Sequence, residues 1–518
     1  MNLRNSFFSV LSFAIILSAC NSTQSSNSLQ RSIPEAEGVT SKGILTFLDS
    51  ASKSRHEFHS IMVLRHGKVV AEGWWNPYSA ELKHTLYSTS KSFTSTAIGF
   101  AVSEKKLSLE DKVISFFPAD KPDTISPFLA DLKIKDLITM SVGQSPDPTF
   151  SVVSKDTNWV KSFLRVPILN KPGTKFLYNT LATYMLSAIV QKVTGEKVLD
   201  FLTPRLFKPL AIEGADWEVD PKGINTGGFG LRLKTEDMAK FGQLYLQKGM
   251  WNGKQIIPKE WVEEATSFKI DQAPETPQSK KDSSDWMQGY CYKYWRCRHK
   301  AFRADCAYGQ FIIVMPEKDA VIAITAESPD MQDEINLVWK YLYPAIQDEK
   351  LAADESTARL LKERLSKLAL PLPEKGVKSN IQQDIAGKKY IMNPNDMHVQ
   401  SLQIQFSESL CSVNFKTIDT TYQLEFTSDS WKLAETNLPG PSLTNHTNKP
   451  IAGLPPLRIA GYFSWIDDNT LQLVSRYIES PHTRTYICHF TGDKITIDLK
   501  SSNSPAIKLA ALEGKQIH

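Results

Sequence analysis

The sequence is poor in cysteine, has no run of basic residues and, beyond its first residues, has no long apolar segment. Only six of its 518 residues are cysteine, and no Cys-x-x-Cys pair occurs, so the common zinc and redox templates are absent. The formal charge is only +4 and lysine and arginine are dispersed, which argues against nucleic acid as a partner. No segment after residue 20 is long and apolar enough to cross a bilayer.

Histidine also gives no metal signal. His56 and His59 have helical spacing, but a structural or catalytic zinc site takes at least three protein ligands. No third candidate lies nearby in the sequence. We therefore expect a solvated surface pair rather than a metal site.

The first twenty residues are expected to be a signal peptide and not part of the fold. Arg4 supplies a short positive region, and the apolar run from Phe7 to Leu17 is too short for a permanent membrane helix. The run ends in Leu17-Ser18-Ala19-Cys20. Small residues before a cysteine resemble a bacterial lipobox, in which Cys20 is lipidated. The alternative is an ordinary secretory signal with an incidental cysteine.

These features predict a protein of the bacterial cell envelope, lipid-anchored through Cys20 and either periplasmic or at the cell surface. Residues 21–32 are rich in Ser, Asn and Gln, which is typical of a flexible tether. The rest of the chain has a globular composition, with 41% hydrophobic and 22% charged residues, and its length predicts two or three domains.

The chain after residue 32 divides by pattern into two parts. Residues 33–373 mix helical and strand periodicities and end in an amphipathic helix closed by Pro371-Leu372-Pro373. Over residues 374–518 apolar residues alternate, as Tyr486, Cys488 and Phe490 do, which predicts a β-rich domain, a small sandwich or barrel. We therefore expect an α+β domain followed by an all-β domain that carries no recognisable chemistry.

The strongest chemical signal is Tyr87-Ser88-Thr89-Ser90-Lys91, which opens a predicted amphipathic helix. Ser88 and Lys91 stand three residues apart and share one helix face, so the amine can take the proton of the hydroxyl. A serine at a helix N-terminus also has its own N–H directed where an oxyanion would form.

The pattern alone is weak. Chance places about two Ser-x-x-Lys matches in a chain of this length, and another match, from Ser50 to Lys53, is read as surface. At Ser88 the alternative is a helix start in which serine and threonine only cap.

Two further segments could complete such a site. Pro172-Gly173 marks a turn that places Tyr178 on a loop at a helix start, where a side chain can reach a cleft. A neighbouring ammonium, here Lys91, would lower the pKa of the phenol; the alternative is a core tyrosine. Residues 302–310 lead into an apolar strand whose edge can supply a second oxyanion donor from its backbone. The alternative for this segment is an ordinary buried hairpin.

Together the three segments resemble the serine hydrolases of the class C β-lactamase and penicillin-binding-protein superfamily, and more closely its esterase and nylon-oligomer-hydrolase branch. They occur in the family's order, joined by Gly227-Gly228-Phe229-Gly230-Leu231, and the resemblance covers about residues 33–350. It implies an antiparallel sheet flanked by helices and packed on an all-helical subdomain, with the active site between them. It implies no metal and no organic cofactor.

The resemblance also assigns roles. It makes Ser88 the nucleophile, Lys91 its activating partner and Tyr178 the acid/base that protonates the leaving group. It places the second oxyanion donor at the backbone N–H of Asp305. Gly309 and Gln310 match the esterase-like branch.

The sequence departs from the family pattern in three places. The family's Tyr-x-Asn appears as Tyr178-Asn179-Thr180, so the amide that orients substrate is displaced to Asn179 or replaced by Thr180. The Lys-Thr-Gly of true β-lactamases occurs nowhere in the chain, which argues against efficient β-lactam turnover because those residues hold the antibiotic's carboxylate. Cys306 stands where relatives carry glycine, and its side chain could narrow the cleft.

Three functions are compatible with these residues. The first is a carboxylesterase or amidase that acts on a small ester or amide through an acyl-enzyme on Ser88. The second is a D-Ala-D-Ala peptidase or weak β-lactamase, and the third is a non-catalytic binding lipoprotein of the same fold. The missing Lys-Thr-Gly favours the first over the second, and the intact Ser88, Lys91 and Tyr178 disfavour the third.

The remaining cysteines and a basic cluster leave alternatives open. Outside the cytoplasm a disulfide or buried thiols are expected rather than a zinc site, and Cys411 and Cys488 could pair across strands. Arg298, His299 and Arg303 could form a cationic rim that selects an acidic substrate. We favour a solvated edge for them.

Overall fold

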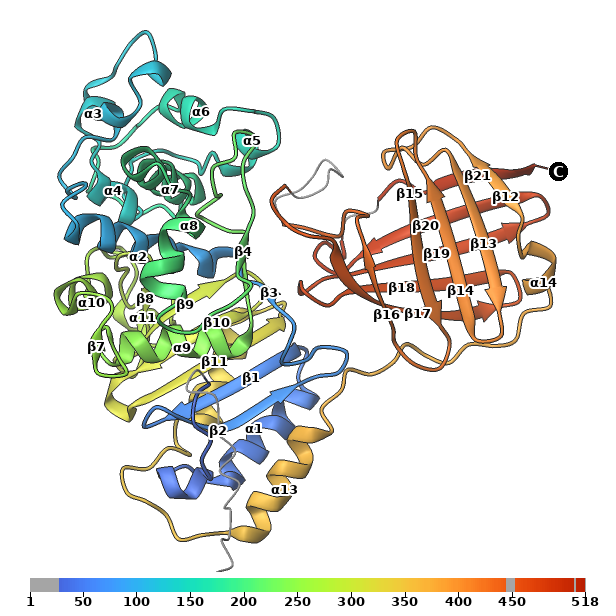
Figure 1. Ribbon diagram of the computed structural model, residues 1–518, viewed down its shortest axis with the longest axis horizontal. Coiled ribbons are helices and arrows are strands. Elements are labelled where there is room, and N and C mark those ends of the chain that lie inside the picture. The colour runs from blue at the N-terminus through green and yellow to red at the C-terminus, as the bar shows by residue number, and fades with distance from the viewer. Residues whose placement is uncertain (1–27, 444–451, 507–508, 518) are drawn as a thin grey trace, which may run out of the picture.

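The computed structural model describes residues 28–443, 452–506 and 509–517, which form an α+β domain and a C-terminal β-barrel (Figure 1). Residues 1–27 lie outside the described residues. They include the expected signal peptide at 1–20 with its lipidation site Cys20, and residues 21–27 of the expected tether. Within the described ranges no helix combines the length and apolarity needed to cross a bilayer.

The described end of the expected tether is fixed to the domain. Leu29 is buried, and the N–H of Ser32 donates to the carbonyl of Val69 at 2.9 Å. Arg31 forms ion pairs with Glu72 at 2.8 Å and with Glu236 at 2.9 Å. Because burial and paired charge hold this segment, the expectation of a flexible tether was wrong for residues 29–32.

A six-stranded antiparallel sheet forms the centre of the α+β domain. In spatial order its strands are β2 (Lys68–Trp74), β1 (Glu57–Arg65), β11 (Ala320–Glu327), β10 (Gln310–Met315), β9 (Phe302–Cys306) and β8 (Trp295–Arg296). Strands β1, β10 and β11 are almost wholly buried, because helices cover both faces. Strands that are buried on both faces have continuous apolar sequences rather than alternating apolar and polar residues.

Each face of the sheet has its own apolar core. On one face α9 (Thr235–Leu246) packs on β10 and β11. Gly242 permits this approach, since a Cβ at that position would stand 2.6 Å from Val321 Cγ1. On the other face lie α1 (Ser41–Lys53), α12 (Met331–Leu337) and α13 (Glu355–Ser366). The core under α9 continues into the helical subdomain.

The helical subdomain lies on the α9 side of the sheet (Figure 1). Its helices are α2 (Ser90–Ser103), α3 (Pro127–Asp131), α4 (Ile134–Ile138), α5 (Thr149–Val153), α6 (Trp159–Arg165), α7 (Thr180–Thr194) and α8 (Val198–Leu202). Helices α2 and α7 pack against each other. The predicted class, an antiparallel sheet with flanking helices and an all-helical subdomain, is confirmed.

Helix α2 is buried on all sides, so its interpretation as amphipathic was wrong. Every residue from Ser90 to Ala101 is buried. Several of its hydroxyls bond to backbone carbonyls: Ser92 Oγ donates to the carbonyl of Lys293 at 2.7 Å, and Thr94 Oγ1 donates to the carbonyl of Gly227 at 2.8 Å. Hydroxyls that donate to backbone carbonyls let a polar helix face enter a core at reduced cost.

The C-terminal domain is a ten-stranded antiparallel barrel, joined to α13 by a segment that contains α14 (Gln382–Ile385). In spatial order its strands are β15 (Thr421–Thr427), β14 (Leu410–Lys416), β13 (Ser401–Ser407), β12 (Lys389–Met392), β21 (Leu512–Ile517), β20 (Lys494–Ser501), β19 (Thr483–Thr491), β18 (Thr470–Tyr477), β17 (Leu457–Asp467) and β16 (Lys432–Thr436). A parallel bridge between Thr427 and Tyr462 closes the ring. The predicted alternation on β19 is confirmed, since every second residue is buried.

The cysteines of the described chain are reduced and buried. Cys291, Cys297, Cys306, Cys411 and Cys488 are all free thiols, so the considered pairing of Cys411 with Cys488 does not form. Burial raises the pKa of the Cys297 and Cys488 thiols to about 12. Of the alternatives left open by the sequence, the structure selects buried thiols.

The two histidines at the start of β1 are also buried, so their interpretation as a solvated pair was wrong. His59 lies on β1, a central strand, with Nδ1 3.1 Å from His84 Nε2 and Nε2 3.0 Å from Glu57 Oε1. His56 just precedes the strand and contacts Ser328 and Asp333. Among the described residues no group of three or more potential metal ligands gathers.

Candidate active site

Ser88 lies on a short turn that feeds directly into α2. The turn η2 (Tyr87–Thr89) is a single 3-10 turn, and α2 continues from Ser90. Tyr87 and Thr89 are buried, whereas Ser88 is half-exposed. Tyr87 has φ of 39°, a left-handed conformation that costs a residue with a side chain on the order of 1–3 kcal/mol. The sharp turn presents the Ser88 hydroxyl at the surface of an otherwise buried segment.

Lys91 provides a buried amine beside this hydroxyl. Its Nζ lies 2.9 Å from Ser88 Oγ and donates to the carbonyl of Gly228 at 2.7 Å. Burial lowers the pKa of Lys91 to about 7, although the nearby carboxylates of Asp147 and Asp305 favour the charged form. At neutral pH about half of the molecules therefore carry a neutral amine at this position, which is the form that can accept a proton.

Tyr178 also reaches the pair, from the loop before α7. Lys91 Nζ lies 4.9 Å from the centre of its ring, and the nearby Ser88 hydroxyl favours the ionised form of the phenol. Burial, reinforced by the charge of Asp305, raises the pKa of this phenol. The expectation that Lys91 would lower it was wrong, because desolvation outweighs an amine that is itself only partly charged. The Tyr178 phenol therefore stays protonated at neutral pH.

Asp305 brings a buried carboxylate to the same place. It lies on β9, and its side chain forms an ion pair with Arg303 at 2.8 Å. Burial raises the pKa of Asp305, and the charges of Arg303 and Lys91 oppose that rise. The role expected of its backbone N–H, as a second oxyanion donor, stays a prediction.

Gly309 and Gln310 shape the turn between β9 and β10. The side chain of Gln310 spans the turn, since Nε2 donates to the carbonyl of Ala307 at 3.0 Å and Oε1 accepts from the N–H of Ala326 at 2.9 Å. Gly309 has φ of +87°, and a Cβ there would stand 1.8 Å from Glu334 Oε2. Both residues therefore support the edge of the site from inside the protein.

Asn179 is also engaged within the fold. It is the N-cap of α7, with Oδ1 accepting from the N–H of Ala182 at 3.1 Å, as asparagine commonly does there. Its Nδ2 donates to Gln144 Oε1 at 2.8 Å, and the side chain is buried. Asn179 therefore stabilises the start of α7, directly after Tyr178.

Aromatic side chains and a buried arginine complete the wall near Tyr178. The Trp295 ring stacks on Tyr178 with centres 5.6 Å apart, and the Tyr290 ring meets it edge-on at 6.4 Å. The Arg303 guanidinium lies 4.1 Å from the centre of the Trp286 ring. Arg303 is fully buried, so the interpretation of this arginine as part of a solvated edge was wrong.

A second buried lysine was missed in the sequence. Lys293 Nζ donates to the carbonyl of Leu137 at 2.7 Å, and its backbone is left-handed with φ of 67°. Burial, together with the charge of Lys91, holds the pKa of Lys293 well below its usual range. No local pattern marks this residue, whereas Arg303 could have been paired with Asp305 because residues two apart on a strand share a face.

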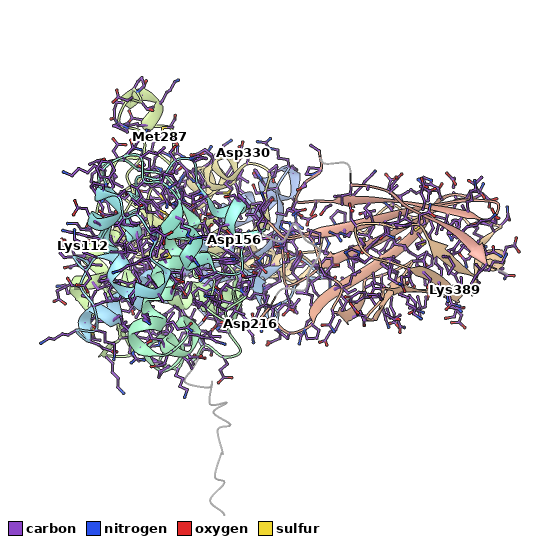
Figure 2. All side chains as sticks on the ribbon, turned by 90° about the horizontal axis from the view of Figure 1, so that it is seen from above. Lys112, Asp156, Asp216, Met287, Asp330 and Lys389 are labelled. Atoms are coloured by element: carbon purple, nitrogen blue, oxygen red, sulfur yellow. The ribbon has the colours of Figure 1, made fainter. Side chains whose placement is uncertain are left out.

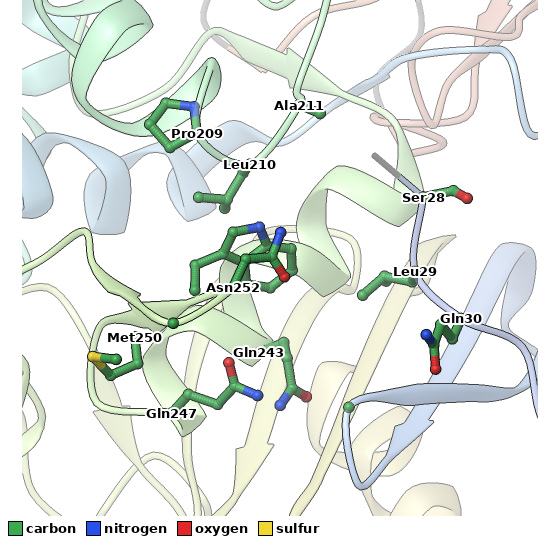
Figure 3. Close-up of a pocket in the computed structure, with 13 residues that line it drawn as sticks. Ser28, Leu29, Gln30, Pro209, Leu210, Ala211, Gln243, Gln247, Met250 and Asn252 are labelled. Carbon is green, nitrogen blue, oxygen red and sulfur yellow. The ribbon is translucent and has the colours of Figure 1, made fainter. Parts of the chain in front are cut away.

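A separate cavity, shown in Figure 3, is unsuited to acyl transfer. It has a volume of about 600 Å³ and lies beside α9 and β6 (Met250–Trp251). The described residues that line it include Gln30, Gln243 and Gln247 but neither a nucleophile paired with a base nor any titratable side chain. This cavity therefore lacks the paired serine and amine that Ser88 and Lys91 supply elsewhere.

Comparison with known proteins agrees with this geometry. The family model described as Beta-lactamase matches residues 57–340, more than half of the chain. The chain belongs to the β-lactamase family. The matched range contains Ser88, Lys91, Tyr178 and Asp305 and ends before the barrel.

Individual members of the family support the same conclusion. The 6-aminohexanoate-dimer hydrolase of Paenarthrobacter ureafaciens is 24% identical over 291 residues, which cover 52% of this chain and 73% of that protein. A candidate D-alanyl-D-alanine carboxypeptidase of Escherichia coli K12 is 28% identical over 142 residues, covering 25% of this chain and 33% of that one.

A solved structure gives the same result. The structure of a candidate 6-aminohexanoate-dimer hydrolase from Bacillus anthracis superposes with a TM-score of 0.52 at 21% identity, over 63% of this chain and 89% of that one. At that identity it shows the shared fold. The predicted resemblance to the β-lactamase superfamily of serine hydrolases, on its nylon-oligomer-hydrolase side, is confirmed.

Proposed function

We propose that this chain is a carboxylesterase or amidase that forms an acyl-enzyme through Ser88. The observation that carries the proposal is the 2.9 Å contact between Ser88 Oγ and a buried amine whose pKa lies near 7. A hydroxyl is a weak nucleophile unless an adjacent base takes its proton. A half-exposed serine beside a neutral lysine and a protonated phenol supplies the nucleophile, the base and the acid that acyl transfer needs.

The reaction would proceed in two steps. Lys91 takes the proton of Ser88 as Oγ attacks the substrate carbonyl, and the N–H groups of Ser88 and Asp305 stabilise the oxyanion. Loss of one such donor typically costs about 3 kcal/mol of barrier. Tyr178 gives its proton to the leaving oxygen or nitrogen and recovers one from Lys91. Water then attacks the acyl carbonyl, and Ser88 regains its proton as the acid leaves.

Two features support a small ester or amide over a β-lactam. The chain lacks Lys-Thr-Gly, and the carboxylates of Asp147 and Asp305 lie near Lys91, where they would disfavour a substrate carboxylate by charge repulsion. The relative from Paenarthrobacter ureafaciens, named as a hydrolase of a 6-aminohexanoate dimer, supports a small substrate.

We also propose that Cys20 carries a lipid and that the chain is attached to the cell envelope, on the strength of Leu17-Ser18-Ala19-Cys20 alone.

The test compares wild type with Ser88→Ala on p-nitrophenyl butyrate, a p-nitroanilide, a chromogenic cephalosporin and a D-Ala-D-Ala peptide. Wild type should hydrolyse the ester or the anilide, and Ser88→Ala should lose at least about 10³-fold in kcat. A fluorophosphonate probe should label wild type at Ser88, as located by peptide mass spectrometry.

The matched control is Ser50→Ala, which removes the serine of another Ser-x-x-Lys match and should retain full activity. Turnover of the peptide or the cephalosporin alone would replace the proposal with the peptidase or β-lactamase alternative. No turnover of any substrate and no label on Ser88 would leave the non-catalytic binding protein.

A further inference from the structure

The connection between β18 and β19, residues 478–482 of the barrel, contacts the segment that leads to Ser88. Thr85 lies on β3 (His84–Thr85), three residues before Ser88. Its N–H donates to the carbonyl of Glu479 at 2.9 Å, and its Oγ1 donates to the same carbonyl at 3.1 Å. Tyr78 Oη donates to the carbonyl of Ser480 at 3.0 Å. The barrel is thus bonded to the active-site domain through backbone groups.

Charged groups strengthen this contact. Arg232, which is buried, pairs with Asp216 at 2.7 Å and with Glu479 of the barrel at 3.2 Å. Figure 2 shows Asp216 on the side of the α+β domain that faces the barrel. Arg476 on β18 pairs with Glu57 on β1. Buried ion pairs with fixed partners specify one docking geometry, because breaking them would leave unpaired charge.

His482 lies at the centre of this interface and is fully buried. Its Nδ1 lies 2.7 Å from Glu327 Oε1, so the proton on Nδ1 is donated to that carboxylate. Its Nε2 lies 2.6 Å from the hydroxyl of Tyr87 and, with the proton on Nδ1, accepts a hydrogen bond from that phenol. The edge-on ring of Tyr308 lies 4.7 Å away, centre to centre, and Tyr308 Oη donates to the barrel carbonyl of Asn503 at 3.0 Å.

The two tyrosines that His482 contacts flank the candidate site from two sides. Tyr87 immediately precedes Ser88, and Tyr308 lies in the turn between β9 and β10, three residues after Asp305. Both have left-handed backbones, with φ of 39° and 68°. Such conformations persist only when surrounding contacts hold them. One barrel histidine therefore touches both strained turns, of which one carries the expected nucleophile and the other follows the strand of the expected oxyanion donor.

From this arrangement we infer that His482 is a positioning residue for the hydrolysis, so that the active site is completed by the barrel. The inference rests on the proposed function. Glu327 fixes the ring of His482, His482 fixes the Tyr87 hydroxyl, and Tyr87 sets the direction of Ser88. Displacing a reacting group by about 1 Å can cost about 10²-fold in rate, so loss of the His482 contact acts on the acylation step.

The experiment uses full-length His482→Ala and Tyr87→Phe, singly and combined, in single-turnover acylation by p-nitrophenyl butyrate. The acylation rate constant should fall about 10–100-fold in each single variant, with KM nearly unchanged. The double variant should lose no more than the more severe single variant, because both changes break one chain of contacts. Tyr87→Phe keeps the ring and removes only the hydroxyl that His482 accepts from.

The matched control is His489→Ala, which removes a half-exposed barrel histidine that pairs with Asp498 at 3.3 Å. It should leave acylation unchanged. A loss confined to KM or to the folded fraction in urea unfolding, or additive losses in the double variant, would overturn the inference. If His482→Ala fails to fold, Tyr87→Phe decides, since an unchanged acylation rate in that variant refutes the positioning role. Absence of Ser88-dependent turnover in wild type would instead refute the proposed function.

Discussion

Raising the pH from 6 to 8 should increase Ser88-dependent hydrolysis about tenfold. Lys91 must be neutral to take the proton of Ser88, and its pKa lies at about 7 because the amine is buried. The neutral fraction of a group with this pKa rises from about 0.1 at pH 6 to about 0.9 at pH 8. The activity should therefore rise through neutral pH and level off above it.

The assay is kcat/KM for p-nitrophenyl butyrate between pH 5.5 and 9.5, since this ratio reports the groups of the free enzyme. Asp147→Asn tests the cause. The Asp147 carboxylate favours charged Lys91, so its removal should lower the pKa and move the midpoint to lower pH. Asparagine retains an oxygen in place of the Oδ1 that accepts from the N–H and Oγ1 of Thr149.

The reasoning would be refuted by a profile that still rises above pH 9, which would mean that burial does not control the amine. An upward shift of the midpoint in Asp147→Asn would refute the electrostatic assignment separately. A falling limb within this range would also contradict the reasoning, because burial raises the pKa of the Tyr178 phenol above its ordinary value and the phenol should stay protonated up to pH 9.5.

Two further predictions concern the turn beside the site and the N-terminus. Gly309→Ala should lower the free energy of unfolding by about 2–4 kcal/mol in urea titrations, because alanine would meet Glu334 Oε2 at 1.8 Å with φ of +87°; a loss below about 0.5 kcal/mol would contradict the described packing. Cells fed an alkyne-tagged fatty acid should incorporate it into the wild-type chain and not into Cys20→Ser, and equal labelling of the two would exclude the anchor at Cys20.

The contact between Ser88 and Lys91 was accessible from the sequence because their relation is local. Ser88 and Lys91 are three residues apart, and a helical turn fixes their distance whatever the rest of the chain does. The fold class followed from a resemblance carried by three short segments. The barrel followed from alternation, since its strands have one face inward and one face outward.

What the sequence could not supply depends on burial and on docking. The pKa direction of Tyr178 was predicted wrongly because desolvation cannot be read from neighbours in sequence, and α2 looked amphipathic because its hydroxyl partners come from distant loops. His482 follows Tyr87 by 395 positions, and only the docking of the barrel brings them together. The interpretation of Arg303 as solvated failed because the rings of Trp286 and Trp295 pack on its guanidinium only in the folded domain.

The reactivity of the buried thiols reports local unfolding of the chain. Burial raises the pKa of Cys291, Cys306 and Cys488 to about 12, so in the native state these sulfurs are both shielded and protonated, whereas alkylating reagents consume exposed thiolates. Cysteines of the barrel and of the α+β domain would be modified only as each part exposes them. The order in which they react would show which of the two parts loosens first, without any probe being attached.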